Sequence, residues 1–207
     1  MTRMTCLFVA LVFIPFLTSA HSFAINQPVP SVGVVEKGEL NYQNEKFSYQ
    51  NWSSAQLNGK VRVILHVAGR ISARNMNNPL ITTLREANLP REYYQTTTIV
   101  NVDDAVIGTG MFVRGRVKDS KQANPWSQFV IDSNGDACRA WELTPKSSAI
   151  VVLDAQGKVR FVKDGALNRQ EIQQVVSLLH TLLHQEESHH DTGTLPVIKT
   201  VKHEIRD

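Results

Sequence analysis

Residues 59–79 read GKVRVILHVAGRISARNMNNP, and the architecture predicted for the whole chain follows from them. The pair Gly59-Lys60 makes a turn into residues 61–67 (VRVILHV). These residues are β-branched and almost continuously apolar, which is typical of a strand buried on both faces. Arg62 and His66 are the polar interruptions. We therefore predict a central strand here, followed by a short loop.

The second half of this stretch predicts a helix over residues 72–88. Its apolar side chains recur at spacings of three and four, which places them on one helical face. They are Leu80, Ile81, Leu84 and Ala87. Pro79 lies inside the helix, and because proline has no backbone N–H we expect a kink there.

Further strands follow towards the C-terminus. They are predicted at residues 94–102, 129–132, 149–154 and 159–163. A loop or partial helix over 105–124 and a short helix over 136–142 lie between them. The initial strand–helix–strand order favours parallel pairing with a right-handed crossover, whereas the last two strands form an antiparallel hairpin. The sequence thus predicts an α/β fold, a mixed β-sheet with helices on both faces.

The two ends of the folded region are also predicted. A loose β-hairpin with its turn at residues 36–39 comes first. The last helix starts at Asn168, which forms a capping box with Glu171. Its apolar face consists of Ile172, Val175, Val176, Leu179, Leu182 and Leu183. Residues 185–207 are polar and lack an apolar period, so we predict a flexible C-terminal tail.

The first 20 residues have the pattern of a signal peptide. Arg3 precedes an apolar run over residues 6–17, which ends in Thr18-Ser19-Ala20. A membrane span needs about 20 apolar residues, so this run is short for one, although an anchor helix is the alternative. Cleavage after Ala20 would leave Cys138 as the single cysteine, so no intramolecular disulfide is expected. No membrane contact is expected after cleavage.

Size and composition favour one globular domain over residues 21–184. Of the 207 residues, 42% are hydrophobic and 20% charged, which are ordinary values for a globular protein. The formal net charge is +3, and Arg3 carries the only charge in the first 20 residues. No cluster of lysine and arginine forms a basic stripe, so nucleic acid is not an expected partner.

Four segments resemble the thioredoxin-like fold in its longer, TlpA-type and peroxiredoxin-like form. Residues 59–68 are similar to its first central strand, and Pro79 stands five residues after Arg74, where those proteins have a kinking proline. Residues 132–135 (DSNG) before Trp141 are similar to the segment that precedes their short helix. Residues 149–167 are similar to their last hairpin. The resemblance covers residues 26–184.

The whole chain also resembles the YtfJ family of exported bacterial proteins. The similarity is carried by five runs: residues 68–70, 94–101, 111–114, 125–129 and 163–167. This resemblance implies a periplasmic location and a thioredoxin-like domain. It implies no assigned reaction.

The resemblance places the redox motif of thioredoxins at residues 71–74. That motif needs two thiols two residues apart at a helix N-terminus, because one attacks and the other resolves the mixed disulfide. Here the four positions read Ile71-Ser72-Ala73-Arg74. Thiol–disulfide and peroxidase chemistry are therefore excluded at these positions. The cis-proline that shapes the substrate groove in those proteins corresponds to Ser148.

Candidate ligand-binding residues remain around this position: Gly69, Arg70, Ser72, Arg74 and Ser148. A helix N-terminus beside Arg70 is suited to an anion or a carboxylate. The alternative is that Ser72 caps the helix and Arg70 is an exposed loop residue. We predict a non-redox binding protein whose partner is a periplasmic protein or a small molecule. No cofactor and no metal are predicted.

Two other functions stay open. A non-thiol enzyme would use Ser72 as nucleophile with His66 as base, or the pair Asp103-Asp104 as acid and base. Weak metal binding would use the C-terminal histidines, of which His180 and His184 have metal-ligand spacing. The full set is His180, His184, His189 and His190. Cys138 is interpreted as a buried structural thiol, with a reactive thiol as the alternative.

Overall fold

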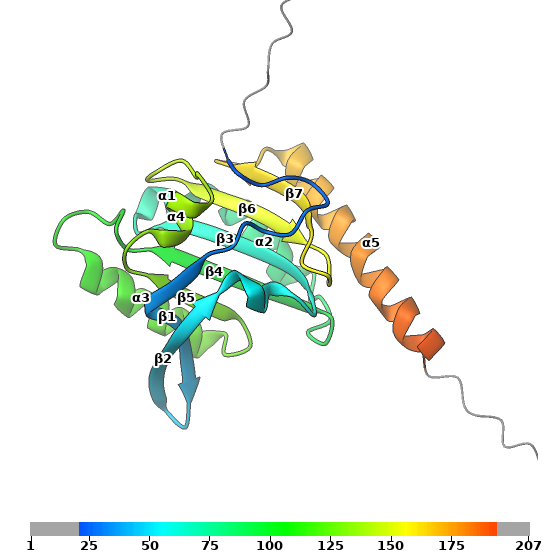
Figure 1. Ribbon diagram of the computed structural model, residues 1–207, viewed down its shortest axis with the longest axis horizontal. Coiled ribbons are helices and arrows are strands. Elements are labelled where there is room, and N and C mark those ends of the chain that lie inside the picture. Colours follow the sequence, from blue (N-terminus) through cyan, green and yellow to red (C-terminus); the bar gives the residue numbers. More distant parts are fainter. Residues whose placement is uncertain (1–20, 194–207) are drawn as a thin grey trace, which may run out of the picture.

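A seven-stranded mixed sheet, in the order β2-β1-β5-β4-β3-β6-β7, forms the centre of the protein (Figure 1). The structure is a computed structural model that describes residues 21–193. The strands are β1 (Gly33–Gln43), β2 (Lys46–Ser53), β3 (Val61–Ala68), β4 (Tyr94–Asn101), β5 (Gln128–Asp132), β6 (Ser148–Leu153) and β7 (Val159–Asp164). The helices are α1 (Ile71–Met76), α2 (Asn78–Glu86), α3 (Gly110–Ala123), α4 (Asp136–Ala140) and α5 (Arg169–Gly193), with a 3₁₀ turn, η1 (Ser54–Leu57). The predicted signal peptide lies outside the described residues.

Strand β3 is central because it pairs on both sides. It runs parallel to β4 and antiparallel to β6. Strands β6 and β7 form the predicted antiparallel hairpin. This position explains why residues 61–67 are nearly all apolar: each side chain faces one of two covered surfaces. The predicted mixed sheet is confirmed.

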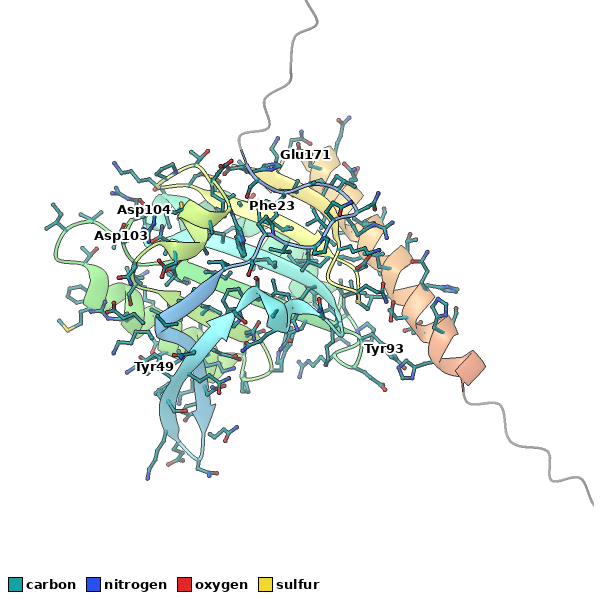
Figure 2. The ribbon with its side chains drawn as sticks, in the orientation of Figure 1. Phe23, Tyr49, Tyr93, Asp103, Asp104 and Glu171 are labelled. Atoms are coloured by element: carbon teal, nitrogen blue, oxygen red, sulfur yellow. The ribbon has the colours of Figure 1, made fainter. Side chains whose placement is uncertain are left out.

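Helices cover both faces of the sheet, as predicted. One face carries α2 and α5, whose Leu80 and Leu179 pack with Leu65 of β3, and α3 lies on the same face. On the other face, α4 and residues 21–32 pack over Ile64. Phe23 of this N-terminal segment, labelled in Figure 2, packs against Trp141 with ring centroids 5.2 Å apart and ring planes tilted by 53°. No described helix is long and apolar enough to cross a membrane.

The predicted helix over residues 72–88 is wrong as a single element. The chain breaks at Asn77 and forms α1 and α2. Pro79 lies in the first turn of α2, where its missing N–H costs no helical hydrogen bond. Proline therefore marks the start of a second helix and not a kink within one.

The predicted hairpin turn at residues 36–39 is wrong. The chain reverses at Asn44-Glu45, and residues 36–39 lie inside β1. There Lys37 and Gly38 adopt left-handed φ values of 70° and 65°, and the register with β2 shifts. A Cβ on Gly38 would lie 2.2 Å from the carbonyl oxygen of Gln50, which explains the glycine.

Residues 110–123 form a complete helix, α3, where we predicted a loop or partial helix. Helix α5 continues to Gly193, so the first nine residues of the predicted tail are helical. Residues 194–207 lie outside the described part. The capping box is confirmed: Asn168 Oδ1 accepts from the Glu171 N–H at 2.9 Å, and Glu171 Oε2 accepts from the Asn168 N–H at 2.8 Å.

The amide of Asn77 joins three segments at the break between α1 and α2. Its Nδ2 donates to Ser148 Oγ and to the Gly165 carbonyl, both at 3.2 Å. Its Oδ1 accepts from the Leu167 N–H at 3.0 Å. Only 2% of Asn77 is exposed, so water cannot replace these bonds.

We expect Asn77→Ala to lower the free energy of unfolding by about 3 kcal/mol, because it leaves a buried N–H and a carbonyl without partners. The measurement is urea denaturation. Asn78→Ala is the matched control, because Asn78 is exposed and its amide bonds only to Asn75. Equal losses in both variants would contradict the structural role of Asn77.

The two polar residues of β3 are both buried. Arg62 donates to the Leu57 carbonyl at 3.0 Å and to Thr97 Oγ1 at 2.9 Å. Burial lowers the pKa of Arg62. His66 is 2% exposed, and its Nε2 has no hydrogen-bond partner in the described part of the chain. Burial lowers the pKa of His66 from 6.5 to about 4, so the native protein holds the neutral imidazole.

We expect His66 to make the protein less stable as pH falls from 6.5 towards 4. In this window the unfolded chain binds a proton that the native chain does not. The free energy of unfolding therefore falls by about 2 to 3 kcal/mol. Free energies of unfolding near pH 7 and near pH 4.5 measure the effect, and His66→Leu should reduce their difference by that amount. The exposed His184→Gln should leave the difference unchanged. An unchanged difference in His66→Leu would contradict the assignment.

Candidate functional site

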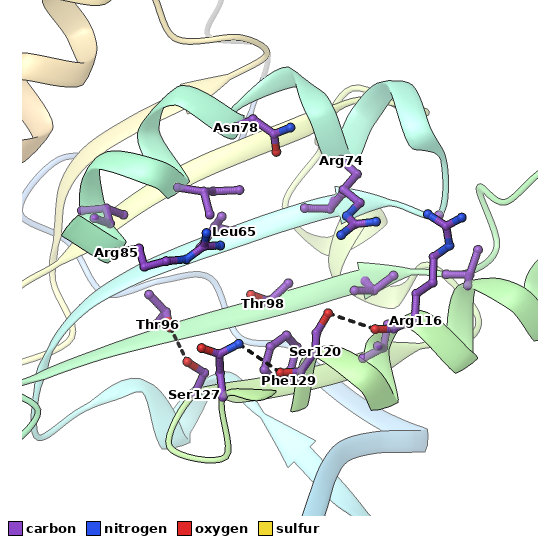
Figure 3. A pocket seen from close by; sticks show the side chains of 18 of the residues that line it. Leu65, Arg74, Asn78, Arg85, Thr96, Thr98, Arg116, Ser120, Ser127 and Phe129 are labelled. Atoms are coloured by element: carbon purple, nitrogen blue, oxygen red, sulfur yellow. Dashed lines mark hydrogen bonds between the residues drawn. The ribbon is translucent and has the colours of Figure 1, made fainter. Parts of the chain in front are cut away.

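A cleft of about 610 Å³ opens between helices α1 and α2 and helix α3 on one face of the sheet (Figure 3). We call it the α2–α3 cleft. Helices α1 and α2 form one wall, α3 forms the other, and β3, β4 and β5 form the floor. Leu65, Thr96, Thr98 and Phe129 come from the floor. Small-molecule sites in proteins usually have volumes of about 300–1,000 Å³, so the cleft has the size of such a site.

The cleft has an apolar interior. Floor and walls contribute Leu65, Val67, Ile81, Leu84, Val113 and Val117, among others. Three further apolar residues line the cleft although they are largely exposed: Ile71 (66%), Val106 (52%) and Phe112 (67%). Exposed large apolar side chains gathered at a cleft are typical of binding sites.

The loop that replaces the redox motif forms one end of the cleft. Gly69 and Arg70 lead from β3 into α1, and both line the cleft. The Gly69 N–H donates to the Asn101 carbonyl at 2.7 Å, and a Cβ on Gly69 would lie 3.0 Å from that oxygen. Arg70 is the N-cap residue of α1, and its Nε donates to the Asp104 carbonyl at 2.6 Å. The loop is thereby fixed against the chain that leaves β4.

In the part of the chain that the structure describes, arginine is the only charged residue type that lines the cleft, and no aspartate or glutamate does so. The arginines are Arg70, Arg74, Arg85, Arg91 and Arg116. Arg91 stacks on Trp126, with its guanidinium carbon 4.8 Å from the ring centroid. Figure 3 shows Arg74 and Arg116 near one end of the cleft and Arg85 near the other. The cleft therefore combines an apolar interior with a cationic rim.

Not all of the predicted site residues meet here. Gly69, Arg70 and Arg74 line the cleft, but Ser72 and Ser148 do not. Ser72 is exposed on α1, inside the helix and not at its cap. Ser148 is buried and accepts the hydrogen bond from Asn77. No cis peptide bond occurs in residues 21–193.

The residues of the non-thiol alternative do not assemble. His66 is buried on the face opposite the cleft, because its neighbours in register, Ile99 and Ala149, belong to the core beneath α4. Ser72 is exposed, so the two side chains cannot form a nucleophile–base pair.

The two aspartates after β4 have different surroundings (Figure 2). Asp104 Oδ2 accepts from Asn101 Nδ2 at 3.1 Å and from the Lys146 N–H at 2.8 Å, whereas Asp103 is exposed. Asp104 thus holds the loop, and the geometry gives no paired acid and base.

The remaining predicted groups lie outside the cleft. His180 and His184 are exposed on α5, and the His190 ring stacks on Tyr93 with centroids 5.2 Å apart. Among the described residues no group of three or more metal-ligating side chains could hold a metal. Cys138 is 8% exposed, donates to the Leu143 carbonyl at 3.5 Å, and has its pKa raised by burial. These are properties of a structural thiol.

Sequence reasoning missed one wall of the cleft. Gly108, Gly110 and Gly115 disfavour a helix, so the sequence predicts only a loop or partial helix over residues 105–124. The spacing of Val113 and Val117, one helical turn apart, indicates an inward-facing stripe, and Arg116 lies beside it. That spacing was the available signal.

Comparison with known proteins supports both family and fold. A family model described as "Bacterial protein of unknown function (YtfJ_HI0045)" matches residues 23–182. The uncharacterized protein YtfJ of Escherichia coli K12 is 52% identical over 180 residues, which cover 87% of this chain and 95% of that protein. An uncharacterized protein of Haemophilus influenzae is 47% identical over 165 residues, 80% of this chain and 90% of that protein.

Solved structures show the same fold at low identity. A candidate thiol:disulfide interchange protein DsbE from Chlorobium tepidum has a TM-score of 0.54 at 12% identity, covering 78% of this chain and 99% of that one. A candidate protein disulfide isomerase from Bacteroides thetaiotaomicron has a TM-score of 0.54 at 15% identity, covering 82% and 96%. The fold is thioredoxin-like, and the chain belongs to the YtfJ family of bacterial proteins of unknown function.

Proposed function

We propose that this chain is an exported, periplasmic protein that binds a ligand in the α2–α3 cleft and performs no thiol–disulfide chemistry. One observation carries the proposal: the loop at the position of the redox motif, without a thiol, forms one end of a cleft of about 610 Å³. Gly69, Arg70 and Arg74 are its residues there. The signal-peptide pattern of residues 1–20 supports export.

The surroundings of the loop support binding over catalysis. Ile71 and Arg74 stand where a thioredoxin-like enzyme has its cysteines, and both line the cleft. The thiol of Cys138 is buried beneath α4, on the other face of the sheet. Among residues 21–193, no cysteine, histidine, aspartate or glutamate lines the cleft, so the described lining offers no nucleophilic thiol and no general base of the usual kinds.

A ligand retained from the cell tests the binding role. We expect protein purified from the periplasmic fraction to carry a small molecule that mass spectrometry of an organic extract detects. Thr98→Trp should remove it, because a Trp side chain from the floor would fill the cleft. Thr181→Trp, on an exposed position of α5, is the matched control and should retain it. Val113→Trp fills the same space from α3, in case Thr98→Trp folds poorly.

Two results would overturn this proposal. One is that wild type, Thr98→Trp and Val113→Trp give the same extracted molecule, while circular dichroism shows that both variants are folded. The other is recovery of the intact chain, with residues 1–20 uncleaved, in the cytoplasmic fraction.

Restoring the cysteines tests the absence of redox chemistry. We expect the wild type to show no reduction of insulin disulfides. We expect the double variant Ile71→Cys, Arg74→Cys to form a disulfide that dithiothreitol reduces, because the two positions lie one turn apart at the start of α1. Insulin turbidity and thiol titration are the measurements, with Ile71→Cys alone as control. Insulin reduction by the wild type would contradict the proposal.

A further inference from the structure

We infer that the α2–α3 cleft binds a free aliphatic carboxylate, a medium-chain fatty acid, with the carboxylate between Arg74 and Arg116 and the chain along β4. This inference rests on the proposed function, because it names the ligand class of the same cleft. It follows from three features: uncompensated positive charge, the position of that charge, and the apolar character of the space beneath it.

The cationic rim has no internal counter-charge. Three ion pairs occur in the described part of the chain, and they involve Arg139, Arg160 and Lys163, none of which lines the cleft. Within the same part, the guanidinium groups of Arg74, Arg85 and Arg116 donate no hydrogen bond to a protein acceptor. Several like charges around one cleft repel one another unless an anion lies among them. The rim is therefore complementary to a negatively charged ligand.

The charge is concentrated where a headgroup would enter. Arg74 projects from α1 and Arg116 from α3, and Figure 3 shows them near the same end of the cleft. Arg70 lines that end too, but its Nε is already bound to the Asp104 carbonyl. The planar fork of a guanidinium matches the two oxygens of a carboxylate, so two arginines from opposite walls suit one such group.

Aliphatic side chains line much of the space beneath the rim: Leu65, Val67, Leu84, Val100 and Val117. The polar groups of the floor are the uncharged hydroxyls of Thr96 and Thr98, and Thr96 already bonds to Ser127, so no charged partner is offered there to a second polar group of the ligand. The lining residues of α3 run from Phe112 to Ser120, about 12 Å along the helix axis, so the space extends along this helix. A single alkyl chain fills such a space and buries its methylenes against aliphatic side chains. Arg85, at the other end, can lay its own methylenes along the chain.

The test uses delipidated protein lacking residues 1–20 and isothermal titration calorimetry with dodecanoate below its micellar concentration. We expect binding, with affinity rising about fourfold per methylene from octanoate to dodecanoate, the gain expected for burying each CH₂. Dodecanol, with the same chain and no charge, should bind at least about tenfold more weakly. Dodecyltrimethylammonium should not bind. Dodecyl phosphate should bind no more tightly than dodecanoate.

Variants assign the headgroup position. Arg74→Gln with Arg116→Gln should weaken dodecanoate binding by about ten- to a hundredfold and leave dodecanol binding unchanged, because charged hydrogen bonds are lost while the apolar floor remains. Arg169→Gln removes the same charge from an exposed position on α5 and should change neither. Thr98→Trp should abolish the binding of both.

The outcomes separate this inference from the proposed function. Equal affinity for dodecanoate, dodecanol and the ammonium compound would overturn the carboxylate assignment but leave an apolar binding cleft. Tighter binding of dodecyl phosphate would overturn it in favour of a phosphate headgroup. If no amphiphile binds while Thr98→Trp still removes the retained molecule, the ligand class is wrong and the binding role stands. If no amphiphile binds and the Trp variants also leave the extracted molecule unchanged, both the fatty-acid assignment and the proposed binding role are wrong.

Discussion

The structure depends on a buried amide at the break between α1 and α2. Asn77 joins the first turn of α2 to the start of β6 and to the loop before α5, through one donor group and one acceptor. Each of these segments would otherwise bury an unpaired polar group, which is costly in a low-dielectric interior. The same contact fixes the direction of α2, and the direction of α2 sets one wall of the cleft.

The sequence predicted most of the sheet and only part of the site. Strand β3 could be predicted because a strand covered on both faces requires a continuous apolar run. The final hairpin could be predicted because residues 155–158 form a turn between two such runs. The helix break was missed because Pro79 has the same local signature in a kink and in a first turn; the deciding contact, from Asn77 to Gly165, spans 88 residues. A contact of that kind leaves no periodic trace in the sequence.

The candidate site shows the same division. Gly69, Arg70 and Arg74 could be predicted because they flank a recognisable strand–helix junction. The position of Arg116 in the cleft could not be predicted, because it depends on α3 packing on the same face of the sheet as α2. Charge complementarity in this protein arises from elements distant in sequence, each carrying an isolated arginine that looks like an ordinary surface residue. Their shared orientation towards one apolar space is the basis of the proposed binding site.

The irregularity in β1 has a consequence for the protein in solution. Strand β2 is at the end of the sheet, and an end strand offers unpaired N–H and C=O groups that can recruit another chain into an aggregate. The left-handed pair Lys37-Gly38 bends and twists its partner strand, so the exposed edge is not a straight ladder over its length. Such a bulge is one of the general devices that disfavour pairing of a sheet edge with another chain, and here it depends on Gly38.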